Sequence, residues 1–251
     1  MKISDKEKAW FPFGVGDTSA QRRVFCLPFA GGGASFYLPW RKATPQGVAL
    51  VPVQYPGRET RLDEPCHLEL DRLVDELARA LLPYLDRAYV LAGYSLGAKV
   101  GFSLAHRLAA LGAPGPDLFV AMAHNSPGNE SGHAGAAQLP DEEFRAFLLR
   151  YGAASEQVFD DPELAQMFLP VLRADIGLVD CPVEQRPLAC PIIAYAGEQD
   201  EIVPPVKMQA WRQFTGDDFD LHSFEGGHFF SKTNKAFLSR FAQDIALAQG
   251  S

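Results

Sequence analysis

The segment from residue 88 to residue 111 constrains the fold more than any other part of this chain. At its centre a G-x-S-x-G pentapeptide, 93–97, separates an apolar run, 88–92, from a run with helical spacing, 98–111. A strand that turns sharply into a helix at Ser95 would hold the hydroxyl in a strained turn, exposed at the sheet edge. Glycine is needed on both sides because a side chain there would collide with the neighbouring strand or helix. We predict that Ser95 is a nucleophile; the alternative is a glycine-serine turn without chemistry.

Strand and helix patterns alternate on either side of this segment. Such alternation is typical of a parallel sheet with helices on both faces. At 251 residues, a chain of this kind ordinarily forms one domain. We therefore predict a single α/β domain, 1–251. The other expected strands are 23–27, 48–53, 118–123, 192–196 and 220–224, and the other expected helices are 35–42, 68–85, 206–214 and 235–248.

Residues 127–187 interrupt this alternation. A stretch rich in glycine, serine and asparagine, 127–135, precedes two helical patterns, 141–151 and 162–179. We predict a helical lid insertion over the carboxyl edge of the strands, which would line a tunnel for an acyl group; the alternative is that these helices merely pack on the core. Large apolar side chains outside the rhythm of the sheet favour the lid: Phe144, Phe147, Leu148, Phe168, Leu169, Val171 and Leu172.

Charge and apolar patterning argue against several classes of partner. The formal net charge is −8, whereas nucleic acids and anionic membranes are bound by basic patches. No run approaches the roughly 20 apolar residues of a membrane span, and residues 1–8 are polar, unlike a signal peptide. We expect a cytoplasmic monomer that binds no metal, nucleic acid or membrane. The cysteines are scattered, without metal-ligand spacing, as in proteins with reduced thiols: Cys26, Cys66, Cys181 and Cys190.

A nucleophilic serine needs a base, and the chain order serine, aspartate, histidine selects a late histidine. His228 lies in the loop 225–230, which follows the last expected strand. Two glycines beside it would let its imidazole reach the sheet edge. His222 lies within the strand, where we expect a structural role. His228 is therefore the predicted base.

The acid that orients the base should follow a strand between the serine and the histidine. The strand 118–123 is followed by His-Asn-Ser, which offers no carboxylate. The strand 192–196 is followed by a turn in which Asp200 could reach the base, fix its tautomer and stabilise the imidazolium. We predict Asp200 as the acid. Glu198 and Glu201 are the alternatives, and either could be a simple surface charge.

Acyl transfer also needs two backbone N–H donors for the oxyanion. One should belong to Leu96, the residue after the nucleophile, and the other to Ala30 in the glycine-rich loop 28–33. The competing interpretation of this loop is a phosphate cradle. It lacks both the G-x-G-x-x-G spacing and a Walker lysine, so we favour the oxyanion hole.

With these segments assembled, the chain resembles the type II thioesterases, stand-alone α/β-hydrolases that accompany modular polyketide and nonribosomal peptide synthases. The resemblance extends from Trp10 to the C-terminal helix and includes the predicted triad. The tyrosine-proline-glycine-arginine turn is absent from α/β-hydrolases in general and therefore narrows the assignment. The motifs that carry the resemblance are Leu27-Pro28-Phe29-Ala30-Gly31-Gly32, Gln54-Tyr55-Pro56-Gly57-Arg58, Leu172-Arg173-Ala174-Asp175 and Gly226-Gly227-His228-Phe229-Phe230.

The resemblance implies hydrolysis of acyl groups from the phosphopantetheine arm of acyl or peptidyl carrier protein domains, which clears stalled or mis-primed units. No cofactor is expected, because the arm belongs to the substrate. The alternatives are a thioesterase that releases a finished product or a medium-chain acyl group, a general carboxylesterase, and a non-catalytic carrier-binding module. Arg58, Arg61 and Lys99 are candidate docking cations for an acidic carrier, or else ordinary surface or fold-stabilising charges.

Three departures from the family pattern bear on the acyl preference. Tyr94 stands where the family often has histidine, and Lys99 where an apolar residue is usual. After the strand 118–123 the family commonly has a basic pair before Ala-Pro, whereas this chain reads Ala-His-Asn-Ser-Pro. We expect these changes near the mouth or floor of the acyl pocket. Asp175, in one of the shared motifs, is expected to position the lid.

Overall fold

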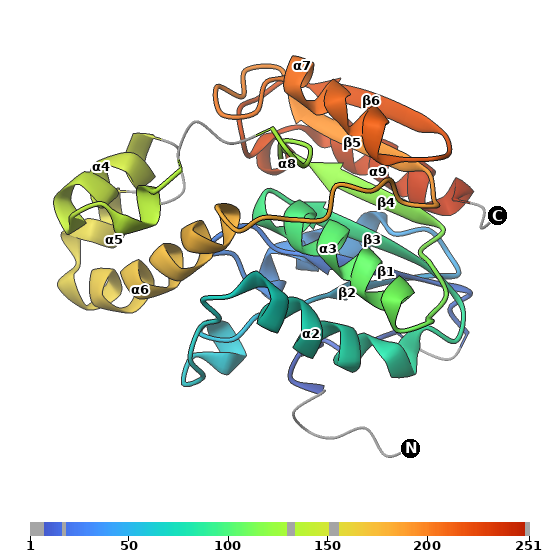
Figure 1. The fold of residues 1–251 in the computed structure, drawn as a ribbon, viewed down its shortest axis with the longest axis horizontal. Coiled ribbons are helices and arrows are strands. Elements are labelled where there is room, and N and C mark those ends of the chain that lie inside the picture. The colour runs from blue at the N-terminus through green and yellow to red at the C-terminus, as the bar shows by residue number, and fades with distance from the viewer. Residues whose placement is uncertain (1–7, 17–18, 130–133, 151–155, 249–251) are drawn as a thin grey trace.

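The described part of the chain forms one parallel sheet with helices on both faces (Figure 1). The computed structural model describes residues 8–16, 19–129, 134–150 and 156–248. The strands lie in the order β2-β1-β3-β4-β5-β6, and each pairs in parallel with its neighbours. The predicted α/β architecture is therefore confirmed. The strands are β1 (Arg22–Leu27), β2 (Val48–Pro52), β3 (Ala88–Tyr94), β4 (Leu118–Met122), β5 (Ile192–Gly197) and β6 (Phe219–Phe224).

The central strand β3 positions the predicted nucleophile. It pairs with β1 on one side and with β4 on the other. Its apolar residues do not alternate with polar ones, because helices bury both faces of the sheet. The chain runs from β1 to the edge strand β2 and then crosses to the far side of β1 to form β3, so the strand order reverses there. Open α/β sheets bind ligands in the crevice at such a reversal, where Ser95 lies.

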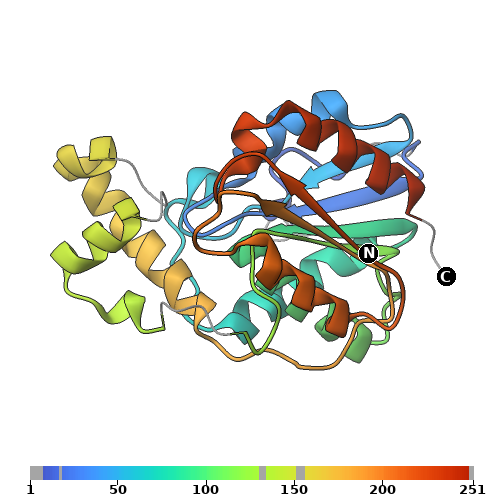
Figure 2. The same cartoon turned by 90° about the horizontal axis from the view of Figure 1, so that it is seen from above.

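Helices cover the two faces of the sheet in separate layers, as Figure 2 shows. On one face, α2 (Leu70–Leu81) packs against α3 (Leu96–Ala110), beside α7 (Pro205–Met208) and the 3-10 helix η5 (Gln209–Phe214). On the other face, α9 (Lys235–Leu247) packs against η1 (Ala34–Ala43) through ring contacts. The remaining short elements of the body are η2 (Glu59–Arg61), η3 (Leu82–Tyr84) and α8 (Phe230–Thr233).

Several predicted helices have different bounds or a different type, for local reasons. The helix expected over 35–42 is a 3-10 helix that contains Pro39, and proline disfavours a regular α-helix there. The helix expected over 68–85 ends at Leu81, and a 3-10 turn containing Pro83 follows it. The helix expected over 206–214 divides into α7 and η5. The single turn α8 was not predicted, because four residues carry no readable period.

Residues 127–129, 134–150 and 156–187 form the described part of the predicted insertion, whose helices lie at one end of the sheet (Figure 1). Three helices occur after the 3-10 turn η4 (Ala136–Gln138), not two: α4 (Asp141–Arg150), α5 (Glu156–Asp160) and α6 (Pro162–Val179). They share a small apolar cluster of their own. Tyr151, residues 130–133 of the polar stretch, and residues 1–7 of the polar N-terminus lie outside the described residues. A lid function stays a prediction.

Within the described ranges, none of the helices has both the length and the apolar character needed to span a bilayer.

Candidate active site

Ser95 occupies a strained turn between β3 and α3. Its backbone angles are φ 51° and ψ −119°, a region that residues other than glycine rarely adopt. The Ser95 N–H donates to the Met122 carbonyl at 2.7 Å, and its own carbonyl accepts from the third residue along at 2.8 Å. A Cβ on Gly93 would lie 2.2 Å from the Gly97 carbonyl oxygen, and one on Gly97 2.1 Å from that of Leu27. Both glycines are therefore required sterically.

The structure brings Ser95, His228 and Asp200 together at the carboxyl edge of the sheet. His228 Nε2 lies 3.1 Å from Ser95 Oγ, and His228 Nδ1 lies 2.8 Å from Asp200 Oδ2. Both are hydrogen-bond distances. The serine follows β3, the aspartate follows β5 and the histidine follows β6, so parallel strands deliver all three side chains to one edge. This arrangement fits a nucleophile, a base and an orienting acid.

Asp200 is held as a carboxylate. It is only 2% exposed, and its Oδ1 accepts from the N–H groups of Ile202 at 2.9 Å and Val203 at 3.0 Å. Burial alone would raise the pKa of Asp200, but the hydrogen bond from His228 and these two N–H donors outweigh it and hold the pKa below its ordinary value. The alternatives Glu198 and Glu201 are exposed.

Tyr94, one of the departures from the family pattern, contacts the loop that carries His228. Its hydroxyl donates to the His228 carbonyl at 2.7 Å, and its ring stacks on Phe229. It is fully buried. A charged or flexible residue at position 94 would not make these contacts. Tyr94 therefore helps to hold His228 in position. The sequence predicts that Tyr94 lies near the pocket but carries no local signal of this contact. His222 lies in β6 as expected, with Nε2 2.9 Å from Asp220 Oδ2.

The two predicted oxyanion donors lie on elements that face the serine. Leu96 is the first residue of α3, and first-turn N–H groups have no acceptor within their own helix. Ala30 lines the same cavity as Ser95 and His228. The next residue, Gly31, adopts φ 75° and donates its N–H to Asp175 Oδ2 at 2.7 Å, which fixes the loop. The assignment of Ala30 and Leu96 as donors stays a prediction.

Asp175 links the insertion to this loop through a buried ion pair. It lies on α6, and its carboxylate receives both terminal nitrogens of Arg58, one of them at 2.9 Å. Such bidentate pairing fixes orientation as well as charge. The pair connects α6 with the loop after β1 and with the turn after β2. Asp175 therefore positions the insertion, as expected from the shared motif.

The prediction that Arg58, Arg61 and Lys99 form a docking patch is wrong. They are 5%, 3% and 8% exposed, respectively. Arg58 is taken by Asp175, Arg61 lies over the Trp10 ring at 4.3 Å, and Lys99 donates to two backbone carbonyls. All three stabilise the fold, which was the alternative. The sequence positions of these cations do not show which of their side chains the fold buries.

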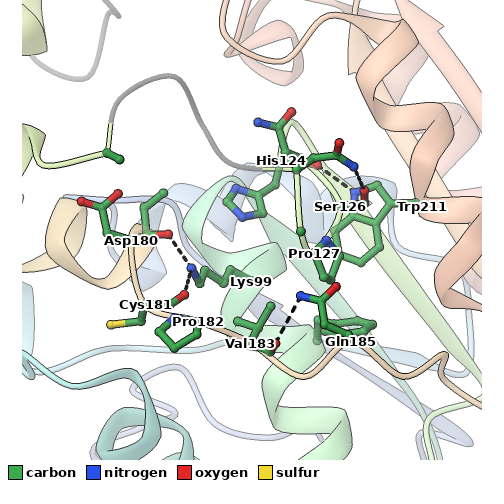
Figure 3. Close-up of a pocket in the computed structure, with 16 residues that line it drawn as sticks. Lys99, His124, Ser126, Pro127, Asp180, Cys181, Pro182, Val183, Gln185 and Trp211 are labelled. Atoms are coloured by element: carbon green, nitrogen blue, oxygen red, sulfur yellow. Dashed lines mark hydrogen bonds between the residues drawn. The ribbon is translucent and has the colours of Figure 1, made fainter.

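A small apolar cavity of about 90 Å³ lies over Ser95. The insertion contributes Phe147 from α4 and Ile176 from α6, and the body contributes Phe29 and Phe229. A second cavity, of about 320 Å³, lies beside it (Figure 3). Four residues line both cavities: His124, Asn125, Val179 and Asp180.

His124, which lies between the two cavities, is held neutral. Burial, and then the charges of Lys99 and His228, lower the pKa of His124 to about 3. Its carbonyl accepts from Trp211 Nε1 at 2.7 Å, which fixes the backbone after β4. The serine cavity therefore presents an apolar surface, a neutral imidazole and the Ser95–His228 pair to a bound substrate.

Comparisons with known proteins find relatives in sequence and in fold. A family model described as a thioesterase domain matches residues 22–245. The gramicidin S biosynthesis protein GrsT of Aneurinibacillus migulanus is 32% identical over 246 residues, 96% of this chain and 95% of that protein. RedJ, a thioesterase from the prodiginine biosynthetic pathway of Streptomyces coelicolor, has a TM-score of 0.83 at 29% identity, covering 95% of this chain and 99% of RedJ. BorB, the type II thioesterase from the borrelidin biosynthetic cluster, has a TM-score of 0.81 at 32% identity, covering 94% and 98%.

Proposed function

Because this chain belongs to the thioesterase family, as a type II thioesterase of polyketide and nonribosomal peptide biosynthesis, we propose that Ser95, His228 and Asp200 hydrolyse acyl groups from carrier proteins. The predicted α/β-hydrolase fold is confirmed by the same likenesses. The substrate is an acyl group on the phosphopantetheine arm of an acyl or peptidyl carrier domain. Its removal edits stalled or mis-primed units.

The observation that supports these roles is the chain of two hydrogen bonds from serine to histidine to aspartate. His228 Nε2 takes the proton of Ser95 Oγ as the oxygen attacks the thioester carbonyl. Asp200, on the other ring nitrogen, fixes the tautomer and stabilises the imidazolium without taking the proton. The oxyanion that forms is stabilised by the N–H groups of Ala30 and Leu96.

The leaving group needs less help than an amine would. A free thiol has a pKa of about 8.5, so the pantetheine thiolate departs with little need of protonation. Water, activated by His228, then cleaves the ester on Ser95 and regenerates the hydroxyl. The modest volume of the apolar cavity over the serine favours short acyl groups at this point.

A substrate series tests this function. Acetyl-, butyryl-, hexanoyl- and decanoyl-phosphopantetheinyl carrier protein are each incubated with the protein and with Ser95→Ala, and the loss of acyl mass is followed. Hydrolysis by the wild type alone, fastest for the short acyl groups, is expected. A strong bias to decanoyl would favour product or medium-chain release instead, and equal cleavage of matched oxygen esters would favour a carboxylesterase. Carrier-protein binding that is equal in the wild type and in Ser95→Ala, with no hydrolysis by either, would favour a non-catalytic binding module.

A further inference from the structure

The second cavity carries polar groups that the proposed mechanism does not use. It has a volume of about 320 Å³, within the range of small-molecule sites, and shares four residues with the serine cavity (Figure 3). Lys99 lines it, one helical turn along α3 from Ser95. The cavity is therefore close enough for the distal part of an acyl group held on the serine.

Lys99 is a buried cation with a donor to spare. Its Nζ donates to the carbonyl of Val179, the last residue of α6, where helix carbonyls lack donors. It also donates to the carbonyl of Cys181, just beyond the helix, as Figure 3 shows. An ammonium group has three N–H donors. Among the residues that the structure describes, no side chain accepts the third. The exposed Asp180 is nearby, but its Oδ2 accepts from the Gly135 N–H at 2.8 Å.

Asn125 supplies the complementary group. It is 7% exposed, lines both cavities, and its Oδ1 has no hydrogen-bond partner within the described part of the chain. Buried polar atoms are nearly always paired, so one that lines a cavity without a partner calls for an explanation. A bound group with an O–H or N–H would satisfy it.

We propose that this cavity receives the distal part of the acyl group on Ser95, and that Lys99 and Asn125 select acyl groups that carry a hydroxyl. A hydroxyl accepts from the Lys99 ammonium and donates to Asn125 Oδ1, so one group pairs both. An alkyl chain leaves the third Lys99 donor and Asn125 Oδ1 unpaired, and an acyl group with an ammonium is repelled by the lysine. The inference rests on the proposed function, because it assumes acylation of Ser95.

Matched acyl groups test the selection. Hexanoyl-, 3-hydroxyhexanoyl-, 5-hydroxyhexanoyl- and 6-hydroxyhexanoyl-phosphopantetheinyl carrier protein are compared by kcat/KM, with 6-aminohexanoyl as the charged analogue. We expect at least one hydroxyhexanoyl group to exceed hexanoyl by about tenfold or more, the gain typical of one hydrogen bond to a charged group. The 6-aminohexanoyl group should be the slowest of the series.

Two variants then assign the preference. Lys99→Met keeps the length of the side chain and removes the donor, and Asn125→Leu removes the acceptor while leaving the Lys99 contacts in place. Each should bring the ratio of hydroxyhexanoyl to hexanoyl kcat/KM toward one. Lys42→Met, an exposed lysine on the opposite face of the sheet, is the matched control and should keep the wild-type ratio. If Lys99→Met fails to unfold cooperatively, Asn125→Leu carries the test.

The outcomes separate the two proposals. If the folded wild-type protein hydrolyses none of the five acyl groups, the proposed function is overturned. Hydrolysis of hexanoyl as fast as every hydroxyhexanoyl group would overturn only the selection. If both variants keep the wild-type ratio of hydroxyhexanoyl to hexanoyl kcat/KM, because each loses activity equally on both substrates, then Lys99 and Asn125 have a purely structural role. That result would also overturn the selection.

Discussion

Among single residues, the turn at Ser95 requires glycine at positions 93 and 97, where a side chain would not fit. We predict that Gly97→Ala destabilises the protein by about 3 kcal/mol or more, because its Cβ would lie 2.1 Å from the backbone oxygen of Leu27, which cannot move aside. Gly115→Ala is the matched control, since a Cβ there meets nothing within 4 Å. Urea unfolding of both variants measures the difference. Equal stability of the two would contradict the packing described for the turn.

His124 should make stability depend on pH. Its ordinary pKa is about 6.5, and in the folded protein it is about 3, so as pH falls the unfolded chain takes up the proton first. The folded state therefore loses stability between about pH 6.5 and pH 3, by at most about 1.4 kcal/mol per pH unit from this group.

The test compares wild type with His124→Asn by urea unfolding at pH 7, 6, 5 and 4. The variant should lose less stability over this window, so its curve should converge on that of the wild type or cross it as pH falls. Parallel curves would show that His124 is not buried in its neutral form.

The positions of Ser95, Asp200 and His228 were predictable because each follows a segment with the pattern of a strand. Parallel strands bring such positions to one edge whatever the rest of the chain does. The roles of Lys99 and Tyr94 were not predictable in the same way. Their partners are backbone carbonyls in distant segments, Val179, Cys181 and His228, and no local pattern shows such contacts.

At the scale of elements, the Arg58–Asp175 pair fastens α6 to the loops beside the serine. Arg58→Met would leave the Asp175 carboxylate buried without its partner, and we expect destabilisation of about 3 kcal/mol or more. Because Asp175 also binds the Gly31 N–H, kcat/KM should fall with stability. Thermal unfolding and turnover of a carrier-bound acyl group measure the two effects.

Arg72→Met is the control for this prediction. Arg72 pairs with Glu69 on the exposed side of α2, with 74% of its side chain accessible, and such surface pairs contribute little. It should change stability by no more than about 0.5 kcal/mol. A result in which Arg58→Met is as stable as Arg72→Met would show that α6 is held by its apolar contacts alone.

The sequence predicted the type of an element correctly where the hydrophobic period extended over many residues, as in α2 and α9. It did not do so where the element was short. The helix α5 has five residues and the helix α8 has four, which is too few for a repeat to be read. Prolines at 39 and 83 converted expected α-helical turns into 3-10 turns. One contact of the insertion with the active edge is the buried Arg58–Asp175 pair, which joins residues 117 positions apart and which no local pattern predicts.

At the scale of the whole molecule, one edge of the sheet gathers every group that the proposed reaction uses. The reversal of strand order at β1 and β3 places the glycine-rich loop 28–33, with the predicted oxyanion donor Ala30, beside the Ser95 turn, and the segments after β5 and β6 add Asp200 and His228. The insertion covers the same edge and lines the serine cavity. The formal charge of −8 is not offset by an exposed patch of Arg58, Arg61 and Lys99, because all three are buried.

The proposed reaction requires that the acyl group is transferred to Ser95 before water releases it. The most direct test of this transfer mixes the protein with hexanoyl-phosphopantetheinyl carrier protein, quenches in acid within milliseconds to seconds, and maps the acyl mass by peptide mass spectrometry. We expect a transient hexanoyl ester on the peptide that contains Ser95, and neither adduct nor hydrolysis in Ser95→Ala. An adduct on another residue such as Cys66, or hydrolysis that persists in Ser95→Ala, would contradict the proposed reaction.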